Sequence, residues 1–138
     1  MRITKKYLDE LTYKIIGCAI EVHKLLGPGL LESVYENCFV HELNLRGLRH
    51  QSQKNIPLNY KGLHLDALLR YDVLVENAII VELKSVSEFE PIHKAIMLTY
   101  LKLLEKPKGI IINFNSVNIF DHGQQTVVNE IYAKLPAE

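Results

Sequence analysis

The sequence predicts a single mixed α/β domain, of the α+β kind, in which a mixed central β-sheet is flanked by helices. Two long segments with helical spacing come first, three strand-like apolar segments follow, and a third helix precedes one more buried strand. The predicted order is therefore α-α-β-β-β-α-β. A crossover helix lets the last strand run parallel to its neighbour, which makes the sheet mixed. Residues 1–138 fit one domain with its own hydrophobic core.

Two amphipathic helices are predicted at residues 7–26 and at about 30–46, separated by the helix-breaking run Gly27-Pro28-Gly29. Gly47 is expected to end the second helix. The apolar face expected for the first helix consists of Leu8, Leu11, Ile15, Ala19, Val22 and Leu26. The inner face expected for the second consists of Leu31, Val34, Cys38 and Leu45.

Three strands are predicted at residues 49–60, 63–75 and 78–84, and Lys61-Gly62 supplies the turn between the first two. A third helix is predicted to begin at Pro91, where proline suits the first helical turn, and to end near Leu104.

The end of the chain is predicted to alternate between strand and less regular structure. The continuous apolar run at residues 109–114 is typical of a buried strand. A short strand is expected near residues 117–120, and a strand or helix near residues 125–134.

Charged side chains interrupt two of the apolar strands. Asp72 lies in the second strand, and Glu82 and Lys84 lie at the end of the third. Such residues are rarely placed in apolar runs unless they are paired or bind a metal. Two carboxylates and an ammonium on one strand pair can hold a divalent cation and activate a water beside it. That is the minimal equipment for metal-assisted hydrolysis.

The loop between these two strands decides whether the charges meet. Side chains alternate along a strand, so Glu82 and Lys84 share one face with Ile80. A three-residue loop at 76–78 pairs Asp72 with Glu82, with Cβ atoms about 4.5–5.5 Å apart, whereas a two-residue loop sends Asp72 to the other face. We expect the longer loop, or a bulge with the same effect, and a cation that relieves the repulsion between the carboxylates.

A structural interpretation of the same residues stays open. Glu-x-Lys at the end of a strand is common, because strands end in solvent, and Asp72 can cap a turn or pair with Arg70. The metal-site interpretation depends on the combination of three suitable groups on one face of adjacent strands.

Composition narrows the functional classes. The formal net charge is zero, which argues against tight binding driven by bulk charge but leaves a nucleic-acid substrate open. No apolar run is long enough to span a membrane and the N-terminus lacks a signal-peptide core, so we expect a cytoplasmic protein without membrane partners. Cys18 and Cys38 lack paired spacing and are expected to be free thiols, and the histidines show no zinc-ligand spacing.

One seven-residue pattern carries a family resemblance. Gly29-Leu-Leu-Glu32-Ser-Val-Tyr35 matches the signature of the GxxExxY proteins, a small family assigned to the PD-(D/E)XK nuclease superfamily. The chain resembles that family from about Leu11 to Val128, including Asp72 and the run Val81-Glu-Leu-Lys84. The resemblance implies a nuclease-like core of strands flanked by helices, in agreement with the order read from the residues.

The resemblance also implies roles in the hydrolysis of phosphodiester bonds of DNA or RNA. Asp72 and Glu82 are the implied carboxylate ligands of Mg²⁺, for which Mn²⁺ can substitute, and the Leu83 carbonyl is a further ligand. Lys84 is implied to orient or deprotonate the attacking water and to stabilise negative charge on the phosphate. Glu32 is implied to bring an extra carboxylate to the metal, although the helix dipole alone favours an acidic residue there.

Two departures from related nucleases keep a second function open. Ile96 occupies the position where relatives often carry glutamine, four residues before Tyr100, and Thr126 stands near where they often carry arginine. Both changes remove polar contacts to the phosphate. The alternative is a catalytically weak or inactive module that uses the nuclease fold to bind or regulate. A third hypothesis is a metal-free interaction protein, and homodimerisation is compatible with each of the three.

Overall fold

The computed structural model describes residues 2–138. The chain opens with α1 (Lys5–Leu26) and α2 (Glu32–Leu45), both close to the predicted bounds. Thr4 caps α1 by accepting a hydrogen bond from the Tyr7 backbone N–H at 3.0 Å. Gly47, with φ of 71°, follows α2 in the left-handed conformation that commonly ends helices, as predicted.

The inner face predicted for α2 was wrong. Tyr35, Phe39 and Leu43 are the buried residues of this helix, whereas Leu31 and Leu45 are 75% and 68% exposed. The apolar residues of α2 lie on several sides of the helix, so their spacing did not identify one face. The aromatic side chains face the sheet, where they bury more apolar surface than the leucines would.

A five-stranded mixed sheet forms the centre of the molecule, in the order β1-β4-β5-β6-β7. Only β5 and β6 run parallel, and the other neighbours are antiparallel. The strands are β1 (His50–Ser52), β4 (Val73–Val75), β5 (Ile79–Lys84), β6 (Lys108–Asn113) and β7 (Gln124–Val128). The sheet therefore matches the predicted mixed class, with one more strand at its far edge.

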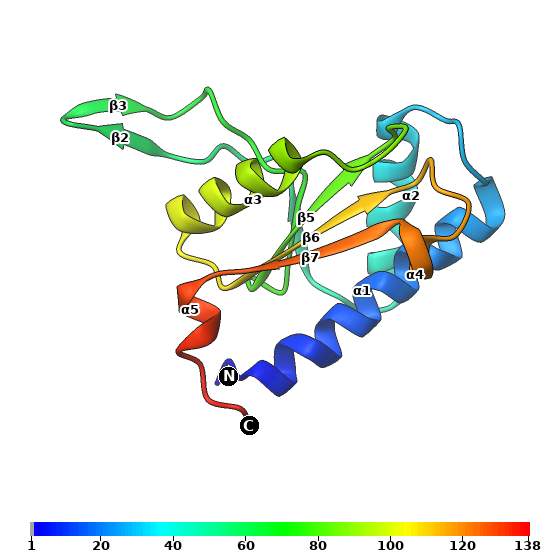
Figure 1. Cartoon of the computed structure of the whole chain (residues 1–138), viewed down its shortest axis with the longest axis horizontal. Helices are drawn as coiled ribbons and strands as arrows, with labels where there is room; N and C mark the ends of the chain where they lie inside the picture. Colours follow the sequence, from blue (N-terminus) through cyan, green and yellow to red (C-terminus); the bar gives the residue numbers. More distant parts are fainter. Residues whose placement is uncertain (1) are drawn as a thin grey trace.

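The predicted strands at 49–60 and 63–75 are each divided in two. Their outer halves form a separate hairpin of β2 (Leu58–Tyr60) and β3 (Leu63–Leu65), joined at the predicted Lys61-Gly62 turn. The division begins at Gln53, whose φ of 53° turns the chain out of the sheet. Figure 1 shows the hairpin projecting away from the central sheet, beyond α3.

Three helices follow the first sheet strands. α3 (Pro91–Leu104) agrees with the prediction, and α4 (Ile119–His122) and α5 (Glu130–Ala133) are single turns. The strand expected near 117–120 was wrong, because the Asn118 side chain accepts a hydrogen bond from the Asp121 N–H at 3.0 Å and caps a helical turn there. The region near 125–134 contains both a strand and a helix, β7 and α5.

The two faces of the sheet are covered by different helices (Figure 1). Ile79, Val81 and Leu83 of β5 pack with α1 and α2, whereas Ile80 packs with Met97 of α3. The alternation predicted for this strand is confirmed, and Glu82 shares the α3 face because it lies two residues from Ile80. No helix within residues 2–138 has the length and apolar character needed to span a bilayer.

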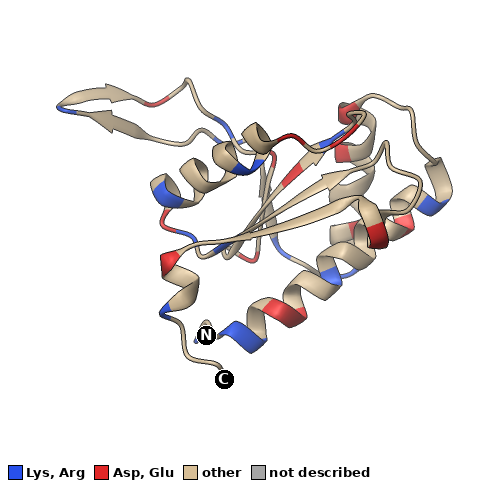
Figure 2. Cartoon of the chain, in the orientation of Figure 1, with Lys and Arg blue, Asp and Glu red and all other residues tan. Residues whose placement is uncertain are grey.

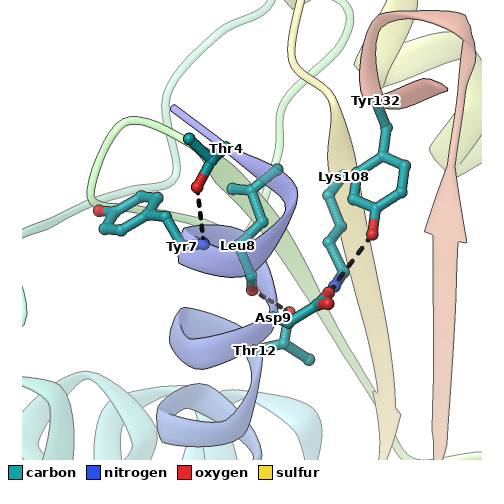
Figure 3. A network of polar contacts seen from close by, with 7 residues as sticks. All are labelled: Thr4, Tyr7, Leu8, Asp9, Thr12, Lys108 and Tyr132. Carbon is teal, nitrogen blue, oxygen red and sulfur yellow. Dashed lines mark hydrogen bonds and ion pairs between the residues drawn. The ribbon is translucent and has the colours of Figure 1, made fainter. Parts of the chain in front are cut away.

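A polar network ties the two ends of the chain together, far from the charged end of β5. Lys108, the first residue of β6, is almost fully buried, and its Nζ lies 3.1 Å from Asp9 Oδ1 on α1. The Tyr132 hydroxyl donates to the same Asp9 oxygen at 3.4 Å (Figure 3). The buried ammonium is thereby paired, as burial of a charge requires.

Candidate functional site

The structure brings Asp72 and Glu82 together, as the loop length predicted. Val75 pairs with Ile79 and Val73 pairs with Val81, so Asp72 lies opposite Glu82 at the next step of the same register. The three residues 76–78 connect the strands, and Glu76 and Asn77 both have positive φ, of 51° and 53°. The primed turn conformation matches the twist of a tight hairpin.

Each of the two carboxylates accepts a hydrogen bond from the backbone of the opposite strand. The Asp72 N–H donates to Glu82 Oε2 at 2.7 Å, and the Leu83 N–H donates to Asp72 Oδ2 at 2.8 Å. These bonds fix both side chains where the ladder of β4 and β5 ends. Within the described residues, the backbone hydrogen bonds of this pair use Glu82 Oε2 and Asp72 Oδ2, and Asp72 Oδ1 has a long contact of 3.4 Å to Gln53 Nε2.

The pair is electrostatically unfavourable without a cation. Glu82 is only 8% exposed. Burial and, next, the negative charge of Asp72 raise the pKa of Glu82 to about 8, although the Asp72 N–H and the Lys84 ammonium oppose the rise. A divalent cation beside the two carboxylates would favour their charged forms.

Two residues that the sequence analysis missed extend this site. Gln53 Nε2 donates to Glu36 Oε1 as well as contacting Asp72, so it links α2 to the carboxylate pair. The pKa of Glu36 is raised by burial and then by the charge of Asp72. Glu36 lies one helical turn after Glu32, and that spacing was the available signal.

Glu32 reaches the end of β5 and not the pair itself. Its Oε2 accepts a hydrogen bond from the Ser85 N–H at 3.1 Å, and Ser85 Oγ donates to the Leu30 carbonyl at 2.8 Å. An open hollow of about 620 Å³ lies beside these residues and is also lined by Asn115. Among residues 2–138, no group of three or more His, Cys, Asp or Glu side chains is arranged to hold a metal ion.

The backbone of Lys84 is held on the side away from Asp72. Lys84 pairs with Asn113 of β6, and the Phe114 N–H donates to the Lys84 carbonyl at 2.9 Å. Asn113 Oδ1 in turn accepts from the Val86 N–H at 3.1 Å, which orders the chain after the strand. The Lys84 side chain therefore leaves a fixed backbone, half-buried, on the same face as Glu82.

α3 contributes one polar group and lacks another. Tyr100 packs against the apolar cluster between α3 and the sheet, and its pKa is raised by burial and then by the charges of Glu82 and Asp72. Ile96, which occupies the position compared above with a glutamine of related nucleases, is 40% exposed and brings no polar group. Thr126 is exposed on β7, which is two strands away from β5 in the sheet. His93 accepts a hydrogen bond from the Glu90 N–H and so belongs to the capping box at the start of α3.

Tyr35 connects the Gly-x-x-Glu-x-x-Tyr segment to the core. Its ring stacks on Phe114 with centroids 4.4 Å apart, and its hydroxyl donates to the Gly27 carbonyl at 2.6 Å and accepts from the Leu30 N–H at 3.1 Å. The hydroxyl thus orders the loop that precedes Glu32. Tyr35 is therefore both a packing residue, through its ring, and a support for the loop, through its hydroxyl.

Tyr35→Phe is expected to lower the free energy of unfolding by about 1–2 kcal/mol, because two hydrogen bonds are lost and the loop groups are left without that partner. Urea unfolding measures the change. Tyr13→Phe, on an 82% exposed tyrosine of α1, is the matched control and should leave stability unchanged. Equal midpoints for the two variants would contradict this role of the Tyr35 hydroxyl.

A five-stranded mixed sheet flanked by helices, with Asp72, Glu82 and Lys84 at the ends of adjacent strands, is consistent with a PD-(D/E)XK nuclease-like fold. A family model described as PD-(D/E)XK nuclease superfamily matches residues 9–127, which is most of the chain. The chain therefore belongs to this superfamily, whose members act on nucleic acids and generally use divalent metals. No curated protein and no solved structure matches the chain.

Proposed function

We propose that this chain is a metal-dependent nuclease of the GxxExxY type that hydrolyses phosphodiester bonds of DNA or RNA. The observation that carries the proposal is the reciprocal pair of Asp72 and Glu82, with Glu82 buried and Lys84 beside it, in a member of a nuclease superfamily. A buried carboxylate pair is costly to a fold. Its presence is accounted for if the pair binds a cation.

The donor atoms fit a hard divalent ion. Asp72 Oδ1 and Glu82 Oε1 are the carboxylate oxygens that the backbone leaves free, and oxygen is the donor that Mg²⁺ and Mn²⁺ prefer. Mg²⁺ keeps several waters, so two carboxylates and the Leu83 carbonyl suffice as protein ligands without a closed cage. When bound, the ion supplies Lewis-acid polarisation of the phosphate and a water of lowered pKa.

The chain's own residues supply the remaining chemistry. Lys84 acts in one of two ways: as an ammonium it orients the attacking water and places positive charge beside the phosphate, and as a neutral amine it accepts the proton of that water. Glu32 and Glu36 flank the site from α2, and either carboxylate can hold waters next to the ion. The Tyr100 phenol, on α3, offers a hydrogen-bond donor on the face where Ile96 offers none.

The exposed Ile96 favours a second candidate, a weak or inactive nuclease-fold module that binds nucleic acid or protein. The two candidates differ in turnover. The nuclease cleaves in Mg²⁺ or Mn²⁺, whereas the module binds without cleavage, and its binding survives loss of the Asp72 and Glu82 carboxylates.

Metal binding tests the site directly. Calorimetric titration of Mg²⁺ and Mn²⁺ is expected to show binding to the wild-type protein and none to an Asp72→Ala, Glu82→Ala double variant, because that variant removes the two free carboxylate oxygens. Glu10→Gln, on an exposed position of α1, is the control and should bind as the wild type does.

Cleavage of labelled DNA and RNA oligonucleotides, with and without EDTA, completes the test. The nuclease proposal requires cleavage that EDTA stops. Absence of cleavage by wild-type protein that does bind nucleic acid would favour the binding module.

A further inference from the structure

The β2–β3 hairpin has no partner in the central sheet. Its two strands pair only with each other, and Figure 1 shows them extending beyond α3. An isolated two-stranded hairpin is marginally stable in water. Its tip is instead shaped locally: Lys61 and Gly62 have φ of 50° and 92°, and the Gly62 N–H donates to Asn59 Oδ1 at 3.0 Å. The hairpin therefore presents a defined tip to solvent.

The tip carries an aromatic ring, an aliphatic side chain and a cation together. Tyr60 pairs with Leu63 across the hairpin, and the two side chains are 60% and 57% exposed. Lys61 Nζ lies 5.4 Å from the centroid of the Tyr60 ring. A ring and an aliphatic group offer flat apolar contact, and the ammonium offers a contact to an anion a few ångströms away.

The charge of the hairpin and its root differs from that of the whole chain. Residues 54–70 contain three cations, Lys54, Lys61 and Arg70, and one anion, Asp66, giving +2 in a chain of formal net charge zero. Figure 2 shows positive residues at the tip and at the root of the hairpin. The rest of the chain therefore has a formal charge of −2, and these residues, called the arm below, form its positively charged extension.

The arm also begins at the candidate site. Arg70 forms an isolated bridge with Asn55 at the root, two residues before Asp72, and its charge acts on Glu36. Gly62 and Asp72 are ten positions apart in the sequence, which allows a reach of at most about 33 Å in extended chain. A polymer bound at Asp72 can thus continue along the arm for several nucleotides.

We propose that the hairpin binds an unpaired strand of the nucleic-acid substrate, with Tyr60 and Leu63 against base faces and Lys61 on a backbone phosphate. Unpaired bases are favoured over a duplex because a ring and an aliphatic side chain contact the faces of bases, which a duplex hides by stacking. The choice of partner rests on the proposed nuclease function, and the arm adds substrate preference to it.

Binding without cleavage tests the arm separately from catalysis. Fluorescence anisotropy in EDTA compares a single-stranded oligonucleotide with its duplex, for the wild type and for variants at the tip. Tyr60→Ala is expected to weaken single-strand binding by about 5- to 100-fold, and Tyr60→Phe to leave it nearly unchanged, because stacking needs the ring alone.

Lys61→Asn removes the charge while Asn-Gly favours the same turn. It is expected to reduce the slope of log binding constant against log salt by about 0.7 for a single strand. Lys14→Gln on α1 is the control for loss of a cation elsewhere. It should leave unchanged both the binding constant and the slope of its logarithm against the logarithm of salt concentration.

Wild-type affinity in both Tyr60→Ala and Lys61→Asn, tighter binding to the duplex, or no binding by the wild type would each overturn the proposal. So would sedimentation showing that Leu63→Ser converts a dimer to a monomer without altering nucleic-acid binding, since the hairpin would then join two copies of the chain. Failure of the arm and failure of the nuclease proposal are distinguishable, because the Tyr60 and Lys61 variants are tested by binding in EDTA and Lys84→Ala is tested by cleavage.

Discussion

Lys84→Ala is expected to lower the rate of oligonucleotide cleavage by about 10²–10⁴-fold, the range typical for loss of a positioned acid–base group. Lys84 ends β5 with its backbone fixed by the parallel pairing to β6, and its charge acts on Glu82. Removing the ammonium leaves the carboxylate pair without its neighbouring cation and leaves the attacking water without an orienting group.

Lys84→Arg separates the two roles of the lysine. Arginine keeps the positive charge but does not give up its proton in proteins, so an arginine that restores activity indicates charge stabilisation, and one that does not indicates proton transfer. Lys94→Ala, on an exposed position of α3, controls for loss of a lysine near the same face. Thermal melting by circular dichroism checks that each variant is folded. Wild-type cleavage by a folded Lys84→Ala protein would remove Lys84 from the mechanism.

The pairing of Asp72 with Glu82 was predictable because it depends on local geometry alone. Strand alternation has a period of two, and the loop length fixes the register, so counting residues from 76 to 78 sufficed. The same counting placed Ile80 and Glu82 on one face, and the structure confirms it through the α3 core.

The contribution of α2 was not predictable in this way. Gln53 and Glu36 meet only because α2 packs on the sheet through Tyr35 and Phe39, and the sequence pattern had selected other residues for that face. The positive φ of Gln53 also has no signal in the sequence, since glutamine is not a residue that favours it.

Glu82→Gln is expected to stabilise the metal-free protein at high pH and to have little effect at low pH. The folded pKa of Glu82 is about 8, above its ordinary value of 4.5, because of burial and the charge of Asp72. Below pH 4.5 the carboxyl is neutral in both states, and its favourable contribution to stability is fully present. As the pH rises towards 8, the unfolded chain releases a proton that the folded protein keeps, so stability falls.

The loss is complete above the folded pKa and amounts to at most about 5 kcal/mol, at about 1.4 kcal/mol per tenfold change in proton affinity. Glutamine keeps an acceptor for the Asp72 N–H and cannot ionise, so the variant escapes this loss. Urea unfolding in EDTA at several pH values gives the free energy of unfolding of the wild type and of Glu82→Gln. The difference between the two values removes the contribution of distant groups that titrate alike in both proteins. The difference should grow from near zero at pH 4.5 to its maximum by pH 9, and parallel curves would contradict the raised pKa.

When Mg²⁺ or Mn²⁺ replaces EDTA in the same experiment, we expect the wild type to become more stable than Glu82→Gln at high pH. An ion that binds the folded wild type stabilises it in proportion to the logarithm of ion concentration over the dissociation constant. The variant, which has lost one charged ligand, gains less. The Glu82 carboxylate thus destabilises the metal-free fold at high pH and stabilises the fold when metal is present. A stability difference between wild type and Glu82→Gln that changes sign on adding metal distinguishes a metal site from a buried ionisable group that binds no ion.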